Sequence, residues 1–369
     1  MEKISILIED LSDRAEGIGR VDSRVAFVKG ALPGQTVEAV ITEDKGRILR
    51  AETIGYKEPL CGGAPLIEMP YEAQLKWKEK HVRDTLIRLG KIENPCIKAI
   101  VAADDPYNYR NKGEFRVGDA RPLCSTACRD CPIQNKLTLQ LIREFDENPV
   151  KNAEELVVRT NRNGDILSYT IQSNGYPLLY KGSNMIEDHI GTLKVEVDAA
   201  SFYQVNSAQC EKLYGIVRDY VQEGDFVLDL YCGAGTIGLF CADKASKIIG
   251  VEVVKPAVIQ ANRNAVINGI VNASFICGKA EDVIDTKLQG VKADTVIVDP
   301  PRAGCKESLL NAIASISPKQ IIYVSCNPAT LARDLKILNS NGFKFIEATP
   351  VDMFPHTVHV ETVVLMSRA

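Results

Sequence analysis

Two short segments near the carboxyl end of the chain carry side chains that could do covalent chemistry together. Cys326 follows an apolar run and precedes Asn327-Pro328, which is typical of a strand tip at the start of a helix. Glu361 follows His356 and His359 at the start of the last predicted strand. A thiol at such a strand tip is expected to be reachable and to have a lowered pKa. Cys326 is therefore a candidate nucleophile and Glu361 a candidate base, although position alone favours a buried strand thiol for Cys326.

A glycine-rich segment indicates a cofactor. Gly233, Gly235 and Gly238 form a Gly-x-Gly-x-x-Gly pattern between an apolar strand and a helix, and Glu252 ends the next strand. Both dinucleotide and nucleoside cofactors use such glycines, and a carboxylate at the second strand can hold ribose hydroxyls. Asp229 precedes the glycines and would repel a pyrophosphate. The pattern therefore favours a cationic, phosphate-free cofactor, S-adenosylmethionine.

A third motif narrows the chemistry. Asp299-Pro300-Pro301-Arg302 follows another strand, at the position of the fourth motif of adenosylmethionine-dependent methyltransferases. Enzymes that methylate amino groups usually have an aromatic residue where Arg302 stands, so this pattern argues against N-methylation. A thiol, a carboxylate and a methyl donor in one cleft indicate methylation of a pyrimidine C5 through a thiolate adduct at C6. Cytosine would need a proton donor near its N3, so uracil fits better.

A second group of cysteines lies in the middle of the chain. Cys124, Cys128 and Cys131 have a spacing typical of iron–sulfur or zinc ligands, and Cys61 is the candidate for a fourth ligand. The alternative is that these residues are loop thiols without a metal. Both interpretations remain open at this point.

The pattern of apolar residues predicts three regions. Residues 1–57 contain short alternating strands between glycine and proline turns, which favours an OB-like barrel that binds oligonucleotides or serves as a cap. Residues 58–190 are less regular and begin with a helix over 71–89. Residues 191–369 alternate strands and helices, which predicts a doubly wound parallel sheet. The predicted strands and helices of this last region are 226–230, 247–251, 255–268, 295–298, 321–324 and 328–338.

The distribution of charged residues and the lengths of the apolar runs limit the possible binding partners. The chain has 44 basic and 48 acidic side chains, and this average argues against a nucleic-acid partner, but residues 74–121 hold 11 basic and 7 acidic ones. The basic residues of the predicted helix are Lys76, Lys78, Lys80, Arg83 and Arg88. We therefore expect RNA contact on the central region. With no apolar run near 20 residues and no signal-peptide pattern, we expect a cytoplasmic monomer without membrane contact.

Seven segments match one known family: 11–34, 109–112, 202–206, 229–238, 299–304, 325–334 and 352–361. On these segments the chain resembles the TRAM-containing RNA (uracil-C5)-methyltransferases of the 23S rRNA 5-methyluridine type. The resemblance implies an N-terminal OB-like TRAM β-barrel, a small α+β central domain and an α/β class I (Rossmann-like) methyltransferase domain. It also implies Cys326 as nucleophile and Glu361 as base. The cofactor residues that it implies are Gln204, Tyr231, Glu252 and Asp299. Together with Asp229, Gly233 and Gly235 of the glycine-rich segment, they form the predicted cofactor site.

The sequence departs from the family at its cysteines. Iron–sulfur members have Cys-x5-Cys-Gly-Gly-Cys and a later cysteine, whereas here only Cys61 of the first trio is present and Ala64 replaces the last. Cys131 matches the later ligand. The resemblance therefore suggests a rearranged [4Fe–4S] site with Cys61, Cys124, Cys128 and Cys131. Thr236 and Lys279 stand where some members have asparagine, which affects secondary cofactor contacts.

The resemblance also orders the functional hypotheses. The leading one is methylation of a uridine in structured RNA, most of all 23S rRNA, because a TRAM barrel accompanies the ribosomal branch more often than the tRNA branch. The alternatives are a tRNA T-loop uridine-C5 methyltransferase and a non-catalytic RNA-binding assembly factor on the same fold. The presence of both Cys326 and Glu361 argues against the non-catalytic alternative.

Overall fold

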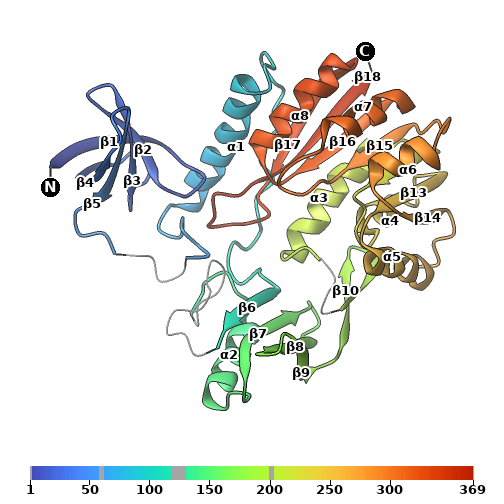
Figure 1. Ribbon diagram of the computed structural model, residues 1–369, viewed down its shortest axis with the longest axis horizontal. Helices are drawn as coiled ribbons and strands as arrows, with labels where there is room; N and C mark the ends of the chain where they lie inside the picture. Colours follow the sequence, from blue (N-terminus) through green and yellow to red (C-terminus); the bar gives the residue numbers. More distant parts are fainter. Residues whose placement is uncertain (1, 58–61, 118–129, 199–202, 369) are drawn as a thin grey trace.

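The computed structural model describes residues 2–57, 62–117, 130–198 and 203–368. Figure 1 shows a small barrel at the N-terminal end, a central region below it and a larger α/β body that ends at the C-terminus. Of the helices in these ranges, none is both long and apolar enough to cross a membrane.

The N-terminal barrel is closed by five strands in the order β1-β2-β3-β5-β4. Along β1 the side chains alternate between solvent and interior, so Ile4, Ile6 and Ile8 fill the barrel with Val28 and Leu49. This alternation follows from the two-residue period of a strand. The predicted OB-like barrel is confirmed. Its strands are β1 (Lys3–Leu11), β2 (Gly17–Val21), β3 (Arg24–Lys29), β4 (Thr36–Asp44) and β5 (Ile48–Thr53).

The central region contains a four-stranded antiparallel sheet covered on one face by helix α2. Phe115, Leu141 and Phe145 pack together with Leu156 and Val158 between the sheet and the helix. A hairpin of two further strands crosses the expected boundary at residue 190 and packs against the α/β body. These elements are β6 (Lys112–Arg116), α2 (Lys136–Glu147), β7 (Ala153–Thr160), β8 (Ile166–Gln172), β9 (Pro177–Gly182), β10 (Met185–Ile190) and β11 (Leu193–Asp198).

The α/β body is built on a seven-stranded sheet in the order β14-β13-β12-β15-β16-β18-β17. The first five strands in this order are parallel, and β18 runs antiparallel to β16 and β17. Helices α1, α6, α7 and α8 cover one face, and α3, α4 and α5 cover the other. The predicted doubly wound sheet is confirmed, and strands 226–230 and 295–298 have the predicted bounds.

Strands and helices alternate along the chain through most of the body. They are α3 (Ser207–Tyr220), β12 (Phe226–Leu230), α4 (Thr236–Phe240), β13 (Lys247–Glu252), α5 (Lys255–Ile267), β14 (Ala273–Cys277), α6 (Ala280–Thr286), β15 (Thr295–Val298), α7 (Glu307–Ile316), β16 (Gln320–Ser325), α8 (Pro328–Ser340), β17 (Phe343–Val351) and β18 (Glu361–Arg368).

Helix α1 (Tyr71–Arg88) lies between the barrel and the body, as Figure 1 shows. Val82 and Leu86 belong to the core of the body, whereas Trp77 packs with Leu11 of the barrel. The prediction that its basic residues face RNA is wrong for Lys78. That side chain has no solvent exposure and is paired with a carboxylate, because its position on the helix points inward.

The close approach at Gly250 provides a test of packing in the body. A Cβ at this position of β13 would lie 2.4 Å from the Phe275 ring and 2.9 Å from Cys232 Sγ. We expect Gly250→Ala to lower the free energy of unfolding by about 1–3 kcal/mol, measured by urea denaturation. Gly215→Ala is the matched control because nothing lies within 4 Å of its Cβ on helix α3; it should stabilise by about 0.5–1 kcal/mol. Equal effects of the two substitutions would contradict this packing.

Candidate active site

The register of the parallel strands brings three predicted site residues to one edge of the sheet. Leu230 pairs with Val251 on one side and with Val298 on the other. The next residues, Tyr231, Glu252 and Asp299, therefore leave three neighbouring strands at the same level. This is the carboxyl edge, where open α/β sheets bind ligands.

Glu252, the last residue of β13, fixes the glycine-rich turn at this edge through hydrogen bonds. Glu252 accepts hydrogen bonds from the Gly233 N–H (3.1 Å) and from the Val254 N–H (2.8 Å). Gly233 has a φ of +55° and Gly235 one of +76°, a left-handed conformation that glycine adopts at little cost. A Cβ at Gly235 would also lie 2.7 Å from the Phe275 ring. The turn therefore requires glycine at this position for both backbone and packing reasons.

Asp229 lies behind the turn. Its side chain has no solvent exposure, and one oxygen accepts a hydrogen bond from the Gly238 N–H at 3.1 Å. Burial, with smaller contributions from the nearby carboxylates of Asp299 and Glu252, raises the pKa of Asp229 to about 7, although the hydrogen bond from Gly238 opposes this rise. The sequence predicted a carboxylate facing the ligand. The structure instead places this side chain inside the body, where it supports the start of α4.

Gln204 lies just before α3, at the junction with the central region. It is 9% exposed, and its carbonyl oxygen accepts a hydrogen bond from the Asn111 side chain at 3.0 Å. Asn111 also donates to Ser207 Oγ at 3.1 Å. The segment 109–112 lies in the central region, where RNA contact is expected, and its asparagine joins that region to the body.

The antiparallel pairing of β16 with β18 brings the predicted nucleophile and base together. Ser325 pairs with Thr362, so the next residue of one strand, Cys326, lies beside the preceding residue of the other, Glu361. Cys326 is half-buried, and Glu361 is only 4% exposed. Residues 35 positions apart in the sequence thereby form one thiol–carboxyl pair.

The predicted lowering of the Cys326 pKa is wrong. Burial raises the pKa of this thiol to about 11, the charges of Glu361 and Asp299 add to the rise, and Arg302 opposes it. Burial also raises the pKa of Glu361 to about 8, again with Asp299 adding and Arg302 opposing. The strand tip alone suggested a lowered value, but desolvation and two carboxyl groups from other strands outweigh the helix start.

Arg302 contributes more than the sequence indicated. Its guanidinium lies 3.3 Å from His359 Nε2, and its charge favours the ionised forms of both Cys326 and Glu361. Burial, with the charge of Arg302 next, lowers the pKa of His359 to about 4, so this imidazole is neutral at pH 7. The sequence pattern at 299–302 could have indicated this role, because Arg302 stands at the carboxyl edge of the sheet where related enzymes have an aromatic residue.

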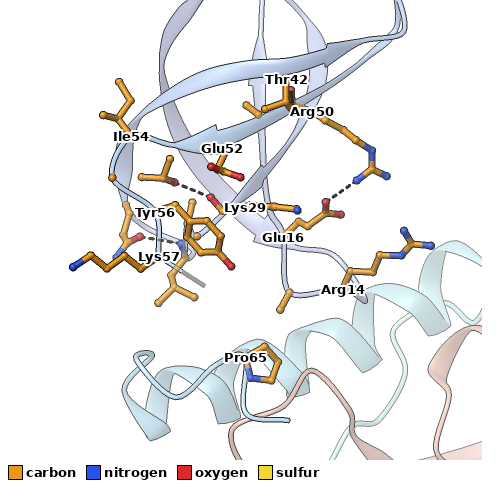
Figure 2. A pocket seen from close by; sticks show the side chains of 18 of the residues that line it. Arg14, Glu16, Lys29, Thr42, Arg50, Glu52, Ile54, Tyr56, Lys57 and Pro65 are labelled. Atoms are coloured by element: carbon orange, nitrogen blue, oxygen red, sulfur yellow. Dashed lines mark hydrogen bonds and ion pairs between the residues drawn. The ribbon is translucent and has the colours of Figure 1, made fainter. Parts of the chain in front are cut away.

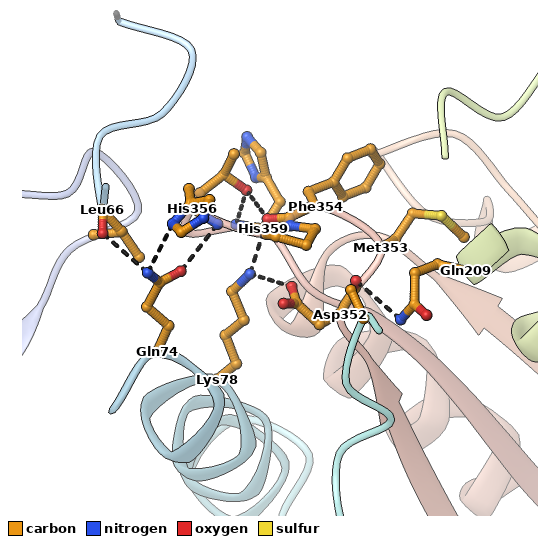
Figure 3. Close-up of polar contacts among 12 residues, drawn as sticks. Leu66, Gln74, Lys78, Gln209, Asp352, Met353, Phe354, His356 and His359 are labelled. Atoms are coloured by element: carbon orange, nitrogen blue, oxygen red, sulfur yellow. Dashed lines mark hydrogen bonds and ion pairs between the residues drawn. The ribbon is translucent and has the colours of Figure 1, made fainter. Parts of the chain in front are cut away.

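The β17–β18 loop, residues 352–360, leads into Glu361 and is anchored by buried polar side chains that sequence reasoning missed (Figure 3). Lys78 of α1 pairs with Asp352, and Gln74 bonds to His356. Gln209 of α3 donates to the Asp352 carbonyl at 3.1 Å. The available signal was the spacing of Gln74 and Lys78, which puts both on one helix face.

The predicted metal ligands lie mostly outside the described residues. This applies to Cys61, Cys124 and Cys128, whereas Cys131 is buried beside Ala64 and Ile133. Within the described ranges, no three His, Cys, Asp or Glu side chains come close enough to hold a metal ion. The position of Cys131 agrees with the resemblance, since Ala64 stands where the family has a ligand.

A separate hollow of about 940 Å³ lies between the barrel and Pro65 (Figure 2). Tyr56 and Arg14 are among the residues that line it. The charges around it are balanced, and Arg50 is paired with Glu16 at 2.6 Å. The charged residues that line it are Arg14, Glu16, Lys29, Glu43, Arg50, Glu52, Lys57 and Glu68.

Comparison with known proteins matches both ends of the chain to family models. Residues 186–369 match the model described as tRNA (Uracil-5-)-methyltransferase, and residues 2–54 match the TRAM domain. An uncharacterized RNA methyltransferase of Bacillus cereus is 35% identical, with 100% of this chain and 97% of the relative aligned. One from Caldanaerobacter subterraneus is 36% identical, with 100% of this chain and 98% of the relative aligned.

A solved structure of similar architecture comes from Pyrococcus abyssi. Its tRNA (uracil-54, C5)-methyltransferase, in complex with S-adenosyl-L-homocysteine, superposes with a TM-score of 0.76 at 25% identity. The match covers 98% of this chain and 100% of that one. The predicted Rossmann-like methyltransferase fold with an N-terminal TRAM barrel is thus confirmed. The chain belongs to the TRAM-containing RNA (uracil-C5)-methyltransferases, which use S-adenosylmethionine as methyl donor.

Proposed function

We propose that this enzyme methylates C5 of a uridine in structured 23S rRNA, with Cys326 as nucleophile and Glu361 as base. The observation that carries the mechanism is the pairing of β16 with β18, which sets a half-buried thiol beside a buried carboxyl group. A buried carboxyl group with a pKa of about 8 suits proton removal near neutral pH, because a general base works best when its pKa is close to the working pH.

The residues at the carboxyl edge fit a cationic nucleoside. Glu252 uses one lone pair of each oxygen on backbone N–H groups, which leaves acceptor sites for ribose hydroxyls. Val253 and Val254 follow directly and are about half exposed, which offers an apolar surface to an adenine. Gln204, Asp229, Tyr231, Gly233, Gly235 and Asp299 complete the proposed set. When bound there, S-adenosylmethionine would supply an electrophilic methyl group, and the carboxyl groups of Glu252 and Asp299 would favour its positive charge.

The chain's own residues account for the other steps. The Cys326 thiolate adds to C6 of the flipped uracil, and the electron pair of the C5–C6 double bond makes C5 nucleophilic. After C5 has gained its methyl group, Glu361 takes the C5 proton, the double bond forms again, and the C6–sulfur bond breaks to release the thiolate. Arg302 stabilises the thiolate, since its charge opposes the rise of the Cys326 pKa.

The choice of 23S rRNA is supported by the TRAM barrel at residues 2–54, through the resemblance to the ribosomal branch. A tRNA T-loop uridine is the second candidate. It is favoured by the P. abyssi tRNA enzyme, whose chain aligns with 98% of this one and therefore has a similar architecture. Leu11 of the barrel and Val358 of the β17–β18 loop belong to one apolar cluster. For either substrate, an RNA strand along the barrel would therefore pass close to the proposed base.

We further propose that Cys131 belongs to a structural [4Fe–4S] site with Cys61, Cys124 and Cys128. The buried position of Cys131 beside Ala64 supports it. We expect anaerobically purified protein to contain about four iron and four sulfide ions per chain. Cys131→Ser should lower both contents. A colourless, iron-free protein with full methyltransferase activity would rule out the cluster.

We expect Cys326→Ala to lower the rate of transfer of labelled methyl groups to RNA by about 10³-fold or more, while the cofactor affinity stays unchanged. The assay compares 23S rRNA with tRNA as substrates and identifies the product as 5-methyluridine or 5-methylcytidine. Cys96→Ala is the matched control because this exposed thiol lies outside the proposed site. Full activity of Cys326→Ala would refute the nucleophile, and methylation of tRNA alone would replace the proposed substrate.

We expect Glu361→Gln to trap a covalent complex of protein and RNA that survives a denaturing gel. The amide cannot take the C5 proton, so addition and methylation proceed while elimination slows by about 10²- to 10⁴-fold. Gel bands labelled from both the RNA and the methyl donor measure the adduct. Normal release of 5-methyluridine by this variant would show that another group is the base.

A further inference from the structure

Helix α1 turns polar side chains toward the interior of the protein. Gln74 and Lys78 have no solvent exposure, and Tyr71 is half-buried. These positions share one face of the helix, because residues three and four apart are neighbours. A buried amide or ammonium is costly unless it finds partners, so the partners identify the role of this face. Each of the three side chains has a partner in the β17–β18 loop. Gln74 also donates to the Leu66 carbonyl at 3.0 Å and to the Met69 carbonyl at 2.7 Å (Figure 3).

Gln74 fixes the middle of this loop. Its Oε1 accepts the His356 backbone N–H at 2.9 Å, and its Nε2 lies 3.0 Å from Nδ1 of the same residue. The Leu66 N–H donates to the His356 carbonyl at 3.0 Å. His356 has a φ of +64°, which is uncommon for residues other than glycine. These contacts therefore hold the chain in a conformation that it would otherwise seldom adopt.

Lys78 fixes the beginning of the loop. Its Nζ donates to Asp352 Oδ1 at 2.5 Å and to the Phe354 carbonyl at 3.0 Å, while the Tyr71 hydroxyl donates to the other oxygen of Asp352 at 2.8 Å. Burying two charges costs about as much as their attraction gains. The pair is therefore weak as a source of stability, but it specifies where residue 352 lies.

Residue 352 adjoins the base through the sheet. Val351 is the strand partner of Glu361 on β17, and Asp352 follows it directly. The other end of the loop carries His359, the contact of Arg302, and then Glu361 itself. We propose that Gln74 and Lys78 are positioning residues for the base: they hold the β17–β18 loop, which leads directly into Glu361, so that its carboxylate stays beside Cys326. This inference rests on the proposed function.

The test separates proton removal from the earlier steps. Gln74→Leu keeps the size of the side chain and removes its hydrogen bonds. In single-turnover reactions with labelled S-adenosylmethionine and substrate RNA, we expect release of 5-methyluridine to slow by about 10- to 100-fold, because small displacements of a reacting group have effects of this size. The denaturation-resistant adduct should accumulate, and the cofactor affinity should not change. A merely structural role would slow methyl transfer and release together.

Gln320→Leu is the matched control. Gln320 begins β16 at the opposite end of the sheet and donates to the Tyr220 carbonyl at 2.7 Å and Thr295 Oγ1 at 2.9 Å. This variant loses comparable bonds and should release product normally. Glu361→Gln is run alongside. If Glu361→Gln traps the adduct and Gln74→Leu does not, the positioning role is wrong. If Glu361→Gln traps no adduct, the assignment of Glu361 as base is wrong, and the inference about Gln74 and Lys78 is wrong as well.

A second pair of variants tests the same contact if Gln74→Leu is too unstable to purify. His356→Gly keeps the backbone bonds to Gln74 and Leu66 and favours the positive φ, whereas His356→Ala opposes it. We expect adduct to accumulate with His356→Ala at least about threefold more than with His356→Gly. Equal amounts with the two variants would overturn the proposal.

Discussion

The buried contact between Lys78 and Asp352 joins two parts of the molecule that are distant in the sequence. Neither side chain reaches solvent, and Tyr71 completes the hydrogen bonding of the carboxylate. Removal of either partner would leave a charge alone in the interior, which costs about 3–5 kcal/mol in proteins. Helix α1, the end of β17 and the β17–β18 loop are therefore held in one arrangement, and the proposed base, Glu361, lies at the end of that loop.

The barrel depends on the same helix. Trp77 donates to Asp10 of β1 at 2.7 Å and packs with Leu11, and Val358 of the β17–β18 loop lies against the same apolar cluster. The TRAM barrel and the proposed base are thus placed by neighbouring turns of α1. An RNA held by the barrel would have a fixed position relative to the cleft, which a flexible linker could not provide.

Burial sets the pKa values of the ionisable groups at the candidate site. Asp229 and Asp299 have pKa values raised to about 7, and Glu361 has a pKa of about 8, mainly because each carboxyl group is desolvated. Such a site favours a neighbouring positive charge, which a sulfonium supplies. The raised pKa of Cys326 keeps the thiol protonated when no substrate is bound. A protonated thiol is less easily oxidised than a thiolate, so this environment protects the proposed nucleophile.

The sequence by itself determined the elements and the order of the motifs. Strand periodicity located β12 and β15, and the glycines, Cys326 and Glu361 lie at the strand ends where the pattern put them. These features are local, since they depend on residues within one strand and its turn. Tertiary structure decided the rest. The pKa of Cys326 rises because Asp299 and Glu361 arrive from other strands in a desolvated cleft. Lys78, one of several lysines on a basic helix, is buried because its partner lies 274 residues away, a contact that no local pattern contains.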